Sequence, residues 1–146
     1  MIIMKHLLVA ALLALFTLTP LAKKSGVVYD VVVTRVIDGD TIAFEANWLP
    51  DPLKKELSIR VFGVDTPEKG SRASCEEENN KAKKASEFTT KTIRNAKRVQ
   101  IELMDWDKYG GRVLGDVIID GKSLRAELIR LKLAREYYGE KKTSWC

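Results

Sequence analysis

The chain has 146 residues, which is enough for one domain and a short leader but not for two domains. It carries 25 lysines and arginines against 20 acidic residues, for a net charge of +5, and it has one histidine, His6. The densest basic run lies between Lys81 and Arg98. It is typical of a solvated helix face, the favoured interpretation on this feature alone, and the alternative is a non-specific attraction for polyanions such as nucleic acids.

Residues 1–22 have the pattern of a secretory signal peptide, with a short positive start and an almost wholly apolar run over 7–18. Cleavage is expected after Ala22, although Pro20 fits the small-residue rule poorly and leaves the exact site open. An uncleaved membrane anchor is the alternative, but the apolar run is shorter than the span of about 20 residues that a bilayer needs. We therefore expect a secreted or periplasmic single domain over 23–146, without stable membrane association.

Removal of the leader would remove His6 and leave a domain without imidazole. That excludes histidine-ligated zinc sites, serine–histidine triads and histidine-dependent nucleases, so a general base must be a carboxylate, lysine, tyrosine or cysteine. Cys75 and Cys146 are too few for a thiolate metal site. In an exported protein this pair predicts one disulfide, with two free thiols as the alternative.

The first half of the domain has the pattern of three strands. A run rich in β-branched residues over 26–37 predicts the first strand, and an Asp-Gly turn leads into a returning strand over 41–45. A long loop over 46–53 with two prolines follows. Alternating apolar and polar residues over 56–64 then predict the third strand.

A capping box with Ser74 as the cap and Glu77 three residues later predicts the start of a helix over about 75–95. Its expected apolar stripe consists of Ala82, Ala85, Phe88, Thr92 and Ile93. Strands are predicted over 99–104 and 112–119, and a second helix after them, with one apolar face formed by Leu124, Leu128 and Leu131. This order predicts an α+β fold, mainly β: a five-stranded OB-fold Greek-key barrel with a helix between strands three and four and another after strand five.

Three segments supply the residue types that cleave phosphodiesters. Asp38 and Asp40 flank a glycine at the tip of the first hairpin, although alone they indicate only an ordinary turn. Arg60 lies in the third predicted strand, and Asp65 and Glu68 follow where that strand ends, so the three side chains can face one side of the sheet. A surface ion pair is the simpler interpretation of this segment taken alone.

The third segment, 107–112, is a tight turn that delivers Arg112 into a strand. Carboxylates without histidine or thiolate favour Ca²⁺ or Mg²⁺ as the metal. Because such an ion activates water less than zinc does, a separate base is needed, and Glu68 is the spare carboxylate. Arg60 and Arg112 supply two guanidinium groups, which suit a phosphoryl group that gains charge in the transition state.

In this order, the motifs resemble the staphylococcal nuclease (thermonuclease) family, a group of secreted OB-fold nucleases that depend on Ca²⁺. The resemblance covers roughly residues 28–138. It implies that Asp40 and Asp65 bind Ca²⁺ through their side chains and Thr66 through its backbone carbonyl, with Asp38 as a further carboxylate close behind them.

The resemblance also implies roles for the remaining motif residues. Glu68 would be the general base, and Arg60 and Arg112 would hold the scissile phosphate. The residues expected around the nucleotide are Lys108, Tyr109 and Tyr138. The family cleaves DNA and RNA with little sequence preference and leaves 3′-phosphate ends.

The chain departs from the family pattern at several points. The turn before Arg112 holds two glycines where the family has one, which leaves open whether this arginine reaches the site. The loop over 46–55 is longer, and the tail after Tyr138 is too short for a last helix. Glu140 stands where a second tyrosine is expected.

We therefore expect a monomeric, exported, metal-dependent endonuclease that acts on DNA and RNA. The main alternative is an OB-fold nucleic-acid-binding module without catalytic activity, and another is an OB domain that binds carbohydrate or protein. The presence of all five groups that the chemistry needs favours the enzyme; they are Asp40, Arg60, Asp65, Glu68 and Arg112. The preference between DNA and RNA and the biological role stay open.

Overall fold

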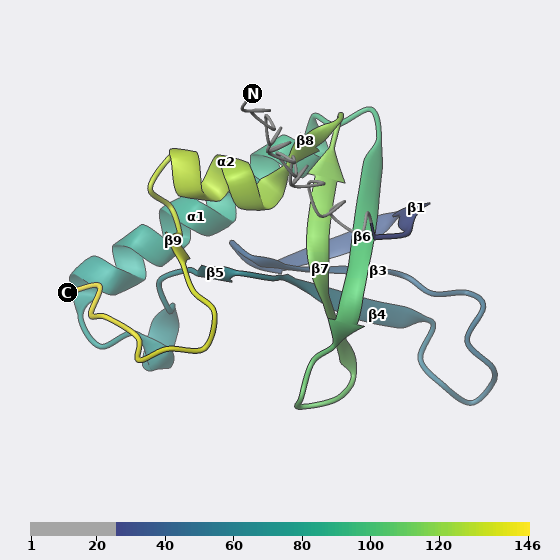
Figure 1. Cartoon of the computed structure of the whole chain (residues 1–146), viewed down its shortest axis with the longest axis horizontal. Coiled ribbons are helices and arrows are strands. Elements are labelled where there is room, and N and C mark those ends of the chain that lie inside the picture. The colour runs from purple at the N-terminus through teal and green to yellow at the C-terminus, as the bar shows by residue number, and fades with distance from the viewer. Residues whose placement is uncertain (1–25) are drawn as a thin grey trace, which may run out of the picture.

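The computed structural model describes residues 26–146, so the predicted signal segment with His6 lies outside the described residues. Its elements, in chain order, are β1 (Val28–Asp30), β2 (Val33–Asp38), β3 (Thr41–Glu45), β4 (Glu56–Val61), β5 (Val64–Asp65), the 3-10 helix η1 (Gly70–Arg72), α1 (Glu76–Arg94), β6 (Val99–Trp106), β7 (Arg112–Ile119), β8 (Lys122–Ser123), α2 (Leu124–Arg130) and β9 (Arg135–Glu136). The two α-helices lie together at one side of the sheet, and the C-terminus lies beside the start of α1 (Figure 1).

The main sheet has the strand order β1-β6-β7-β4-β3-β2, and β8 pairs with β7. Its two outer strands, β1 and β2, are consecutive in the chain. Between them, the Val31 N–H donates to the Val99 carbonyl at 3.1 Å, and the Val32 carbonyl accepts from the Glu45 N–H at 2.9 Å. The predicted first strand, 26–37, is therefore divided into two segments, because it serves both edges of a sheet that curls back on itself. The predicted α+β OB-fold class is confirmed.

Helix α1 begins one residue later than the predicted capping box implied. Cys75 is the N-cap, and its Sγ accepts from the Glu78 N–H at 3.4 Å. The Glu78 carboxylate reaches back to the Ser74 N–H at 2.7 Å. The predicted pair of Ser74 and Glu77 was wrong by one position, because Glu78, and not Glu77, turns inward and is buried.

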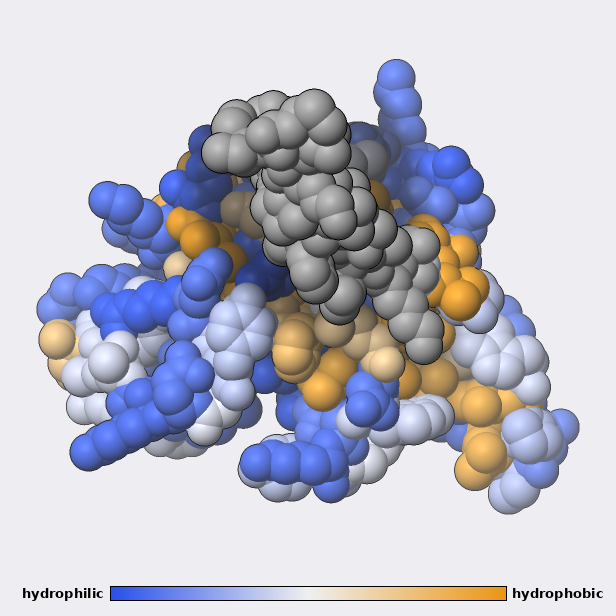
Figure 2. Space-filling model, viewed as in Figure 1, coloured by the Kyte–Doolittle hydropathy of each residue, from blue (hydrophilic) through white to orange (hydrophobic). Residues whose placement is uncertain are grey.

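The core lies between the sheet and the two helices, and consists mainly of aliphatic side chains with Phe44. Leu131, predicted on the buried face of the second helix, is 40% exposed because α2 ends there. Hydrophilic side chains cover most of the visible surface near α1 and the C-terminal tail (Figure 2). None of the helices within residues 26–146 is long and apolar enough to span a membrane.

The inner face of α1 rests directly on the turn between β2 and β3. Thr89, fully buried, donates through its hydroxyl to the Gly39 carbonyl at 2.7 Å. A Cβ at Gly39 would lie 2.7 Å from the Cβ of Ala85. The glycine between Asp38 and Asp40 is therefore needed for this close approach, and the contact fixes both aspartates relative to the helix.

The C-terminal tail is held by a strand pairing and by a disulfide bond. Strand β9 pairs with β5, opposing Arg135 to Asp65, and the sequence pattern did not predict this strand. Cys146 forms a disulfide with Cys75, with 6.0 Å between the Cα atoms, as the cysteine pair predicted. The last residues are thereby brought to the start of α1 without a helix of their own.

We expect Gly39→Ala to destabilise the protein by about 1–3 kcal/mol, the usual cost of adding a methyl group to a packed interior. The added Cβ would lie 2.7 Å from the Ala85 Cβ and 3.1 Å from its carbonyl carbon, so helix or turn must move. Urea denaturation measures the change. Ser86→Ala, elsewhere on α1, is the control and should stay within about 0.5 kcal/mol of wild type. Equal midpoints for wild type and Gly39→Ala would contradict the packing described.

Candidate active site

Arg60 joins the first motif to the second. From β4, its Nη2 donates to the Val64 carbonyl at 3.2 Å and lies 3.5 Å from Oδ2 of Asp40. Asp40 is buried, and its Oδ1 accepts from the Thr41 hydroxyl at 2.8 Å. The register of β3 against β4 places Thr41 opposite Arg60. This pairing brings Asp40, at the tip of the first hairpin, close to Arg60 in β4.

Asp107 holds the third motif, residues 107–112, in place, and the sequence pattern assigns no role to this residue. Its carboxylate is buried, and its Oδ2 accepts from Nε of Arg112 at 2.8 Å. Its Oδ1 accepts from the Tyr109 N–H at 3.1 Å. Burial raises the pKa of Asp107, but these hydrogen bonds and the charges of Arg112 and Arg60 lower it further, so the net pKa lies below the usual value. The two-glycine turn thus holds Arg112 on an ionised carboxylate that feels the charge of Arg60.

Asp65 is a buried carboxylate that is contacted at both of its oxygens. It ends β5 and is only 6% exposed. Its Oδ2 accepts from the indole N–H of Trp145 at 3.0 Å. Nζ of Lys142 lies 2.6 Å from Oδ1, yet not in a geometry that makes a hydrogen bond, so buried Oδ1 has no hydrogen-bond donor among residues 26–146.

Glu68 is the accessible carboxylate of the cluster, with 39% of its side chain exposed. Its oxygens lie 3.4 Å from Nε of Arg72 and 3.9 Å from Nζ of Lys142. Its backbone N–H donates to the buried Glu78 carboxylate at 3.1 Å, which fixes the loop that carries it. Glu68 and Asp65 line one cavity of about 340 Å³, together with Thr66 and the tail residues 142–145.

Lys142 bears a charge stabilised by both acids. Burial lowers the pKa of its ammonium, while the contact with Asp65 and the charge of Glu68 raise it by more, and Arg60 opposes them from nearby. The net pKa lies above the usual value. The charges of Asp65, Glu68 and Arg60 therefore all act on the Lys142 ammonium.

The carboxylates of Asp40 and Asp65 suit a hard cation, although few acidic side chains lie close together in the site. No group of three or more His, Cys, Asp and Glu side chains within residues 26–146 is placed to hold a metal. The predicted ligand set needs only two carboxylates, Asp40 and Asp65, with the Thr66 carbonyl and water. Oxygen donors of this kind fit Ca²⁺ or Mg²⁺. The surroundings of Oδ1 of Asp65 support a cation here, because this buried carboxylate oxygen is approached by a positive charge, the Lys142 ammonium, at 2.6 Å.

The side chains of the other four predicted site residues have no contact with Arg60, Asp65 or Arg112 among those found within residues 26–146. Asp38 lies 3.1 Å from Nζ of Lys69 and 3.4 Å from Nη2 of Arg72, so it orders the loop around η1. The exposed pair consists of Lys108 and Tyr109, with the ammonium 5.0 Å from the ring centroid. Tyr138 packs edge-on against Phe62 and bonds to Arg125 through its hydroxyl. No contact found among residues 26–146 joins Tyr138 to Asp65, Glu68 or Arg112.

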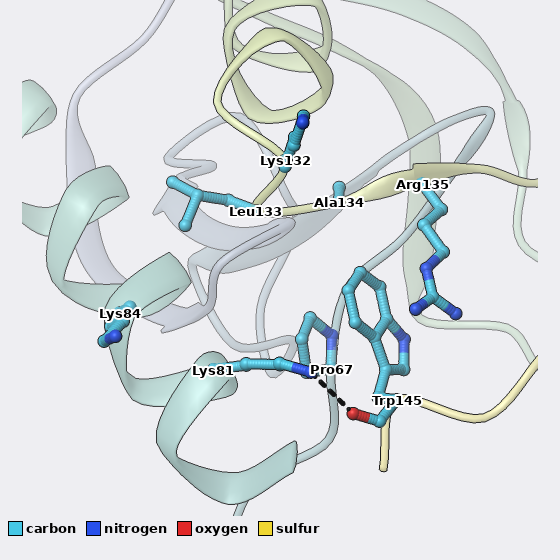
Figure 3. Close-up of a pocket in the computed structure, with 8 residues that line it drawn as sticks. All are labelled: Pro67, Lys81, Lys84, Lys132, Leu133, Ala134, Arg135 and Trp145. Atoms are coloured by element: carbon cyan, nitrogen blue, oxygen red, sulfur yellow. Dashed lines mark hydrogen bonds between the residues drawn. The ribbon is translucent and has the colours of Figure 1, made fainter. Parts of the chain in front are cut away.

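Trp145 also forms a wall of a second cavity, of about 440 Å³, drawn in Figure 3. The guanidinium of Arg135 lies 3.8 Å from the centroid of its ring. The Lys81 ammonium, from α1, donates to the Trp145 carbonyl at 2.9 Å (Figure 3). Arg135 of β9 therefore fixes the indole that bonds to Asp65, and Lys81 of α1 fixes the backbone of the same residue.

A family model described as staphylococcal nuclease homologue matches residues 58–144. The chain is 35% identical over 123 residues to endonuclease YncB of Bacillus subtilis, covering 82% of this chain and 54% of that protein. It is 32% identical over 111 residues to the thermonuclease of Staphylococcus hyicus, covering 73% of this chain and 61% of that protein. The thermonuclease of Staphylococcus intermedius is 34% identical over 105 residues, 71% of this chain and 57% of its own length.

The chain thus spans somewhat more than half the length of these relatives. The matched region contains Arg60, Asp65, Glu68 and Arg112, together with the tail up to Ser144. These matches agree with the fold and with the charged residues described above. The chain belongs to the staphylococcal nuclease family.

Proposed function

We propose that the protein is a metal-dependent endonuclease that hydrolyses phosphodiester bonds of DNA and RNA with low sequence specificity and leaves 3′-phosphate ends. The observation that carries the proposal is the environment of Asp65: a buried carboxylate, approached by an ammonium at 2.6 Å, in a cavity that also contains the accessible Glu68. Arg60 lies 3.5 Å from Asp40, and Arg112 bonds to Asp107, whose carboxylate also feels the charge of Arg60. The names of the relatives, two thermonucleases and an endonuclease, support a nucleic-acid substrate.

The proposed chemistry divides the work among few groups. Asp40 and Asp65, with the Thr66 carbonyl, would hold Ca²⁺, which as a bound cation offsets charge on the phosphate and helps to orient water. Glu68, at the accessible side of the cavity, would accept the proton of the attacking water. Arg60 and Arg112 would hold the phosphoryl oxygens as their charge grows. Products with 3′-phosphate ends require that the bond from phosphorus to the 5′-oxygen breaks and that this oxygen leaves with a proton.

An OB-fold module that binds nucleic acid without cleaving it is the second candidate. Exposed Lys108 and Tyr109 could contact a phosphate and a base in either protein. A pure binding module has no need of a buried carboxylate beside an accessible one, nor of an arginine fixed by Asp107. These features favour the enzyme.

We further propose that residues 1–22 direct export and that the mature domain, 23–146, works as a monomer in a secreted or periplasmic location. The Cys75–Cys146 disulfide supports this location, because such bonds persist in oxidising compartments.

Calcium should support cleavage of plasmid DNA by the purified mature protein, and excess EDTA should abolish it, since Asp65 and Asp40 supply only hard oxygen ligands. Asp65→Asn should lower calcium affinity and cleavage by at least about tenfold, because the amide removes the charge that binds the cation. Isothermal titration calorimetry and a gel assay measure the two effects. Asp51→Asn is the matched control, at a side chain that is 93% exposed. Full cleavage in excess EDTA would exclude the proposed metal dependence.

Glu68→Gln should lower turnover about 10²-fold or more while nucleotide binding persists, because the amide cannot accept the proton. Arg112→Lys should cause a severe loss as well, since lysine cannot make the forked contact to phosphate while also bonding to Asp107. Single-turnover cleavage and equilibrium binding separate the two effects. Glu87→Gln and Arg130→Lys are matched controls on the two helices. Near-native turnover by Arg112→Lys would mean that the two-glycine turn keeps this arginine away from the phosphate.

A further inference from the structure

The last eight residues, 139–146, form a strap across the proposed metal site. Two of its side chains contact the same carboxylate: Trp145 donates to one oxygen of Asp65 at 3.0 Å, and the Lys142 ammonium lies 2.6 Å from the other. The ammonium also lies 3.9 Å from Glu68. A positive charge from the tail thus lies between the proposed metal ligand and the proposed base.

Several contacts hold the strap in this place. Cys146 is bonded to Cys75 at the start of α1, and Trp145 is buried. Arg135 donates to the Ser144 carbonyl at 2.9 Å and stacks on the indole of Trp145. The Lys142 side chain is 46% exposed, and besides its two ion pairs its ammonium lies 5.5 Å from the ring centroid of Tyr137. It can therefore turn toward solvent while Trp145 and the disulfide stay in place.

A divalent cation on Asp65 would face this ammonium at close range. Oδ1 is the oxygen of Asp65 without a hydrogen-bond donor, and it is also the oxygen that Lys142 approaches. Two like charges that share one carboxylate oxygen repel each other strongly in a partly buried cavity. Cation binding at Oδ1 therefore competes with the Lys142 contact.

We propose that Lys142 is a tethered competitor for the metal: in the metal-free protein its ammonium occupies the cation position on Asp65, and the Cys75–Cys146 disulfide supplies the high local concentration that keeps it there. The chain would thus set its own calcium affinity through its tail, and reduction of the disulfide would remove this control. The inference rests on the proposed function, because it requires that Asp65 binds a cation.

Calcium affinity of the oxidised protein tests the competition directly, with calcium chloride alone as the ligand in isothermal titration calorimetry. Lys142→Gln should bind calcium about two- to fivefold more tightly than wild type, the effect expected when one partly exposed ion pair no longer has to be broken. Lys141→Gln removes the same charge from the neighbouring position, and should leave the dissociation constant unchanged. Equal affinities of wild type and Lys142→Gln would overturn the inference, as would an equal gain in Lys141→Gln.

The tether is tested by repeating both titrations after reduction with dithiothreitol. The reagent gives two electrons and two protons to the disulfide, which becomes two thiols, and is itself oxidised to a cyclic disulfide. The ratio of the wild-type to the Lys142→Gln dissociation constant should then fall to about one, because a released tail no longer concentrates the ammonium at Asp65. Cys146→Ser in both backgrounds should give the same ratio. An unchanged ratio in reduced protein would exclude the disulfide as the tether.

Use of a ratio cancels any general effect of reduction, such as the loss of the Trp145 hydrogen bond to Asp65. Circular dichroism of each sample establishes that the fold persists. Absence of both calcium binding and cleavage in the oxidised wild type would overturn the proposed function and this inference together. Normal binding and cleavage with no gain in Lys142→Gln would overturn this inference alone.

Discussion

A carboxylate that is removed from water needs partners, and the partners of Asp65 come from the far end of the chain. The indole N–H of Trp145 and the ammonium of Lys142 both approach it, from about 80 positions later in the sequence. To bring them there, β9 must pair with β5 and the last cysteine must reach the start of α1. The position of the tail is thus tied to the requirement of one buried acid.

A second set of contacts fixes the other side of the site. Helix α1 packs on the turn at Gly39 so closely that no side chain fits, and Thr89 bonds to the carbonyl of that glycine. Asp40 follows this glycine and lies within reach of Arg60. The same helix supplies Cys75 and Glu78 at its first turn, which hold the tail and the Glu68 loop. One helix therefore helps to position both carboxylates proposed as metal ligands, although it carries neither.

The sequence predicts those parts of the structure that depend on neighbours in the chain. The predicted bounds of β3 and β7, 41–45 and 112–119, agree with the structure, because a turn with a local sequence signal precedes each strand. Buried and half-buried residues alternate along β7, whereas the first four residues of β3 are all buried. The division of the first strand escapes such reasoning, since it depends on two different partners, β6 and β3. The capping box was displaced by one residue for a similar reason: Glu78 is selected by the Glu68 loop, which it also bonds, and not by the helix alone.

In the candidate site, too, the residues set by local sequence are predictable and those set by distant contacts are not. Its motif residues are recognisable because each lies in a short segment of unusual composition, whereas Asp107, Lys142 and Trp145 act through contacts that no local pattern records. An acid five residues before Arg112 is a weak signal for the first of these. For the tail, the useful signal was the cysteine pair. Closing a loop with a sequence separation of 71 stabilises the fold by roughly 4 kcal/mol in the chain-entropy model.

The disulfide makes the position of the tail depend on the redox environment, because a disulfide persists only where thiols are oxidised. Because the residues held by this bond are those that contact Asp65, the integrity of the proposed metal site depends on the compartment in which the chain folds. An exported chain would complete the strap after it leaves the reducing cytosol, and the arrangement of charges around Asp65 would be established only there.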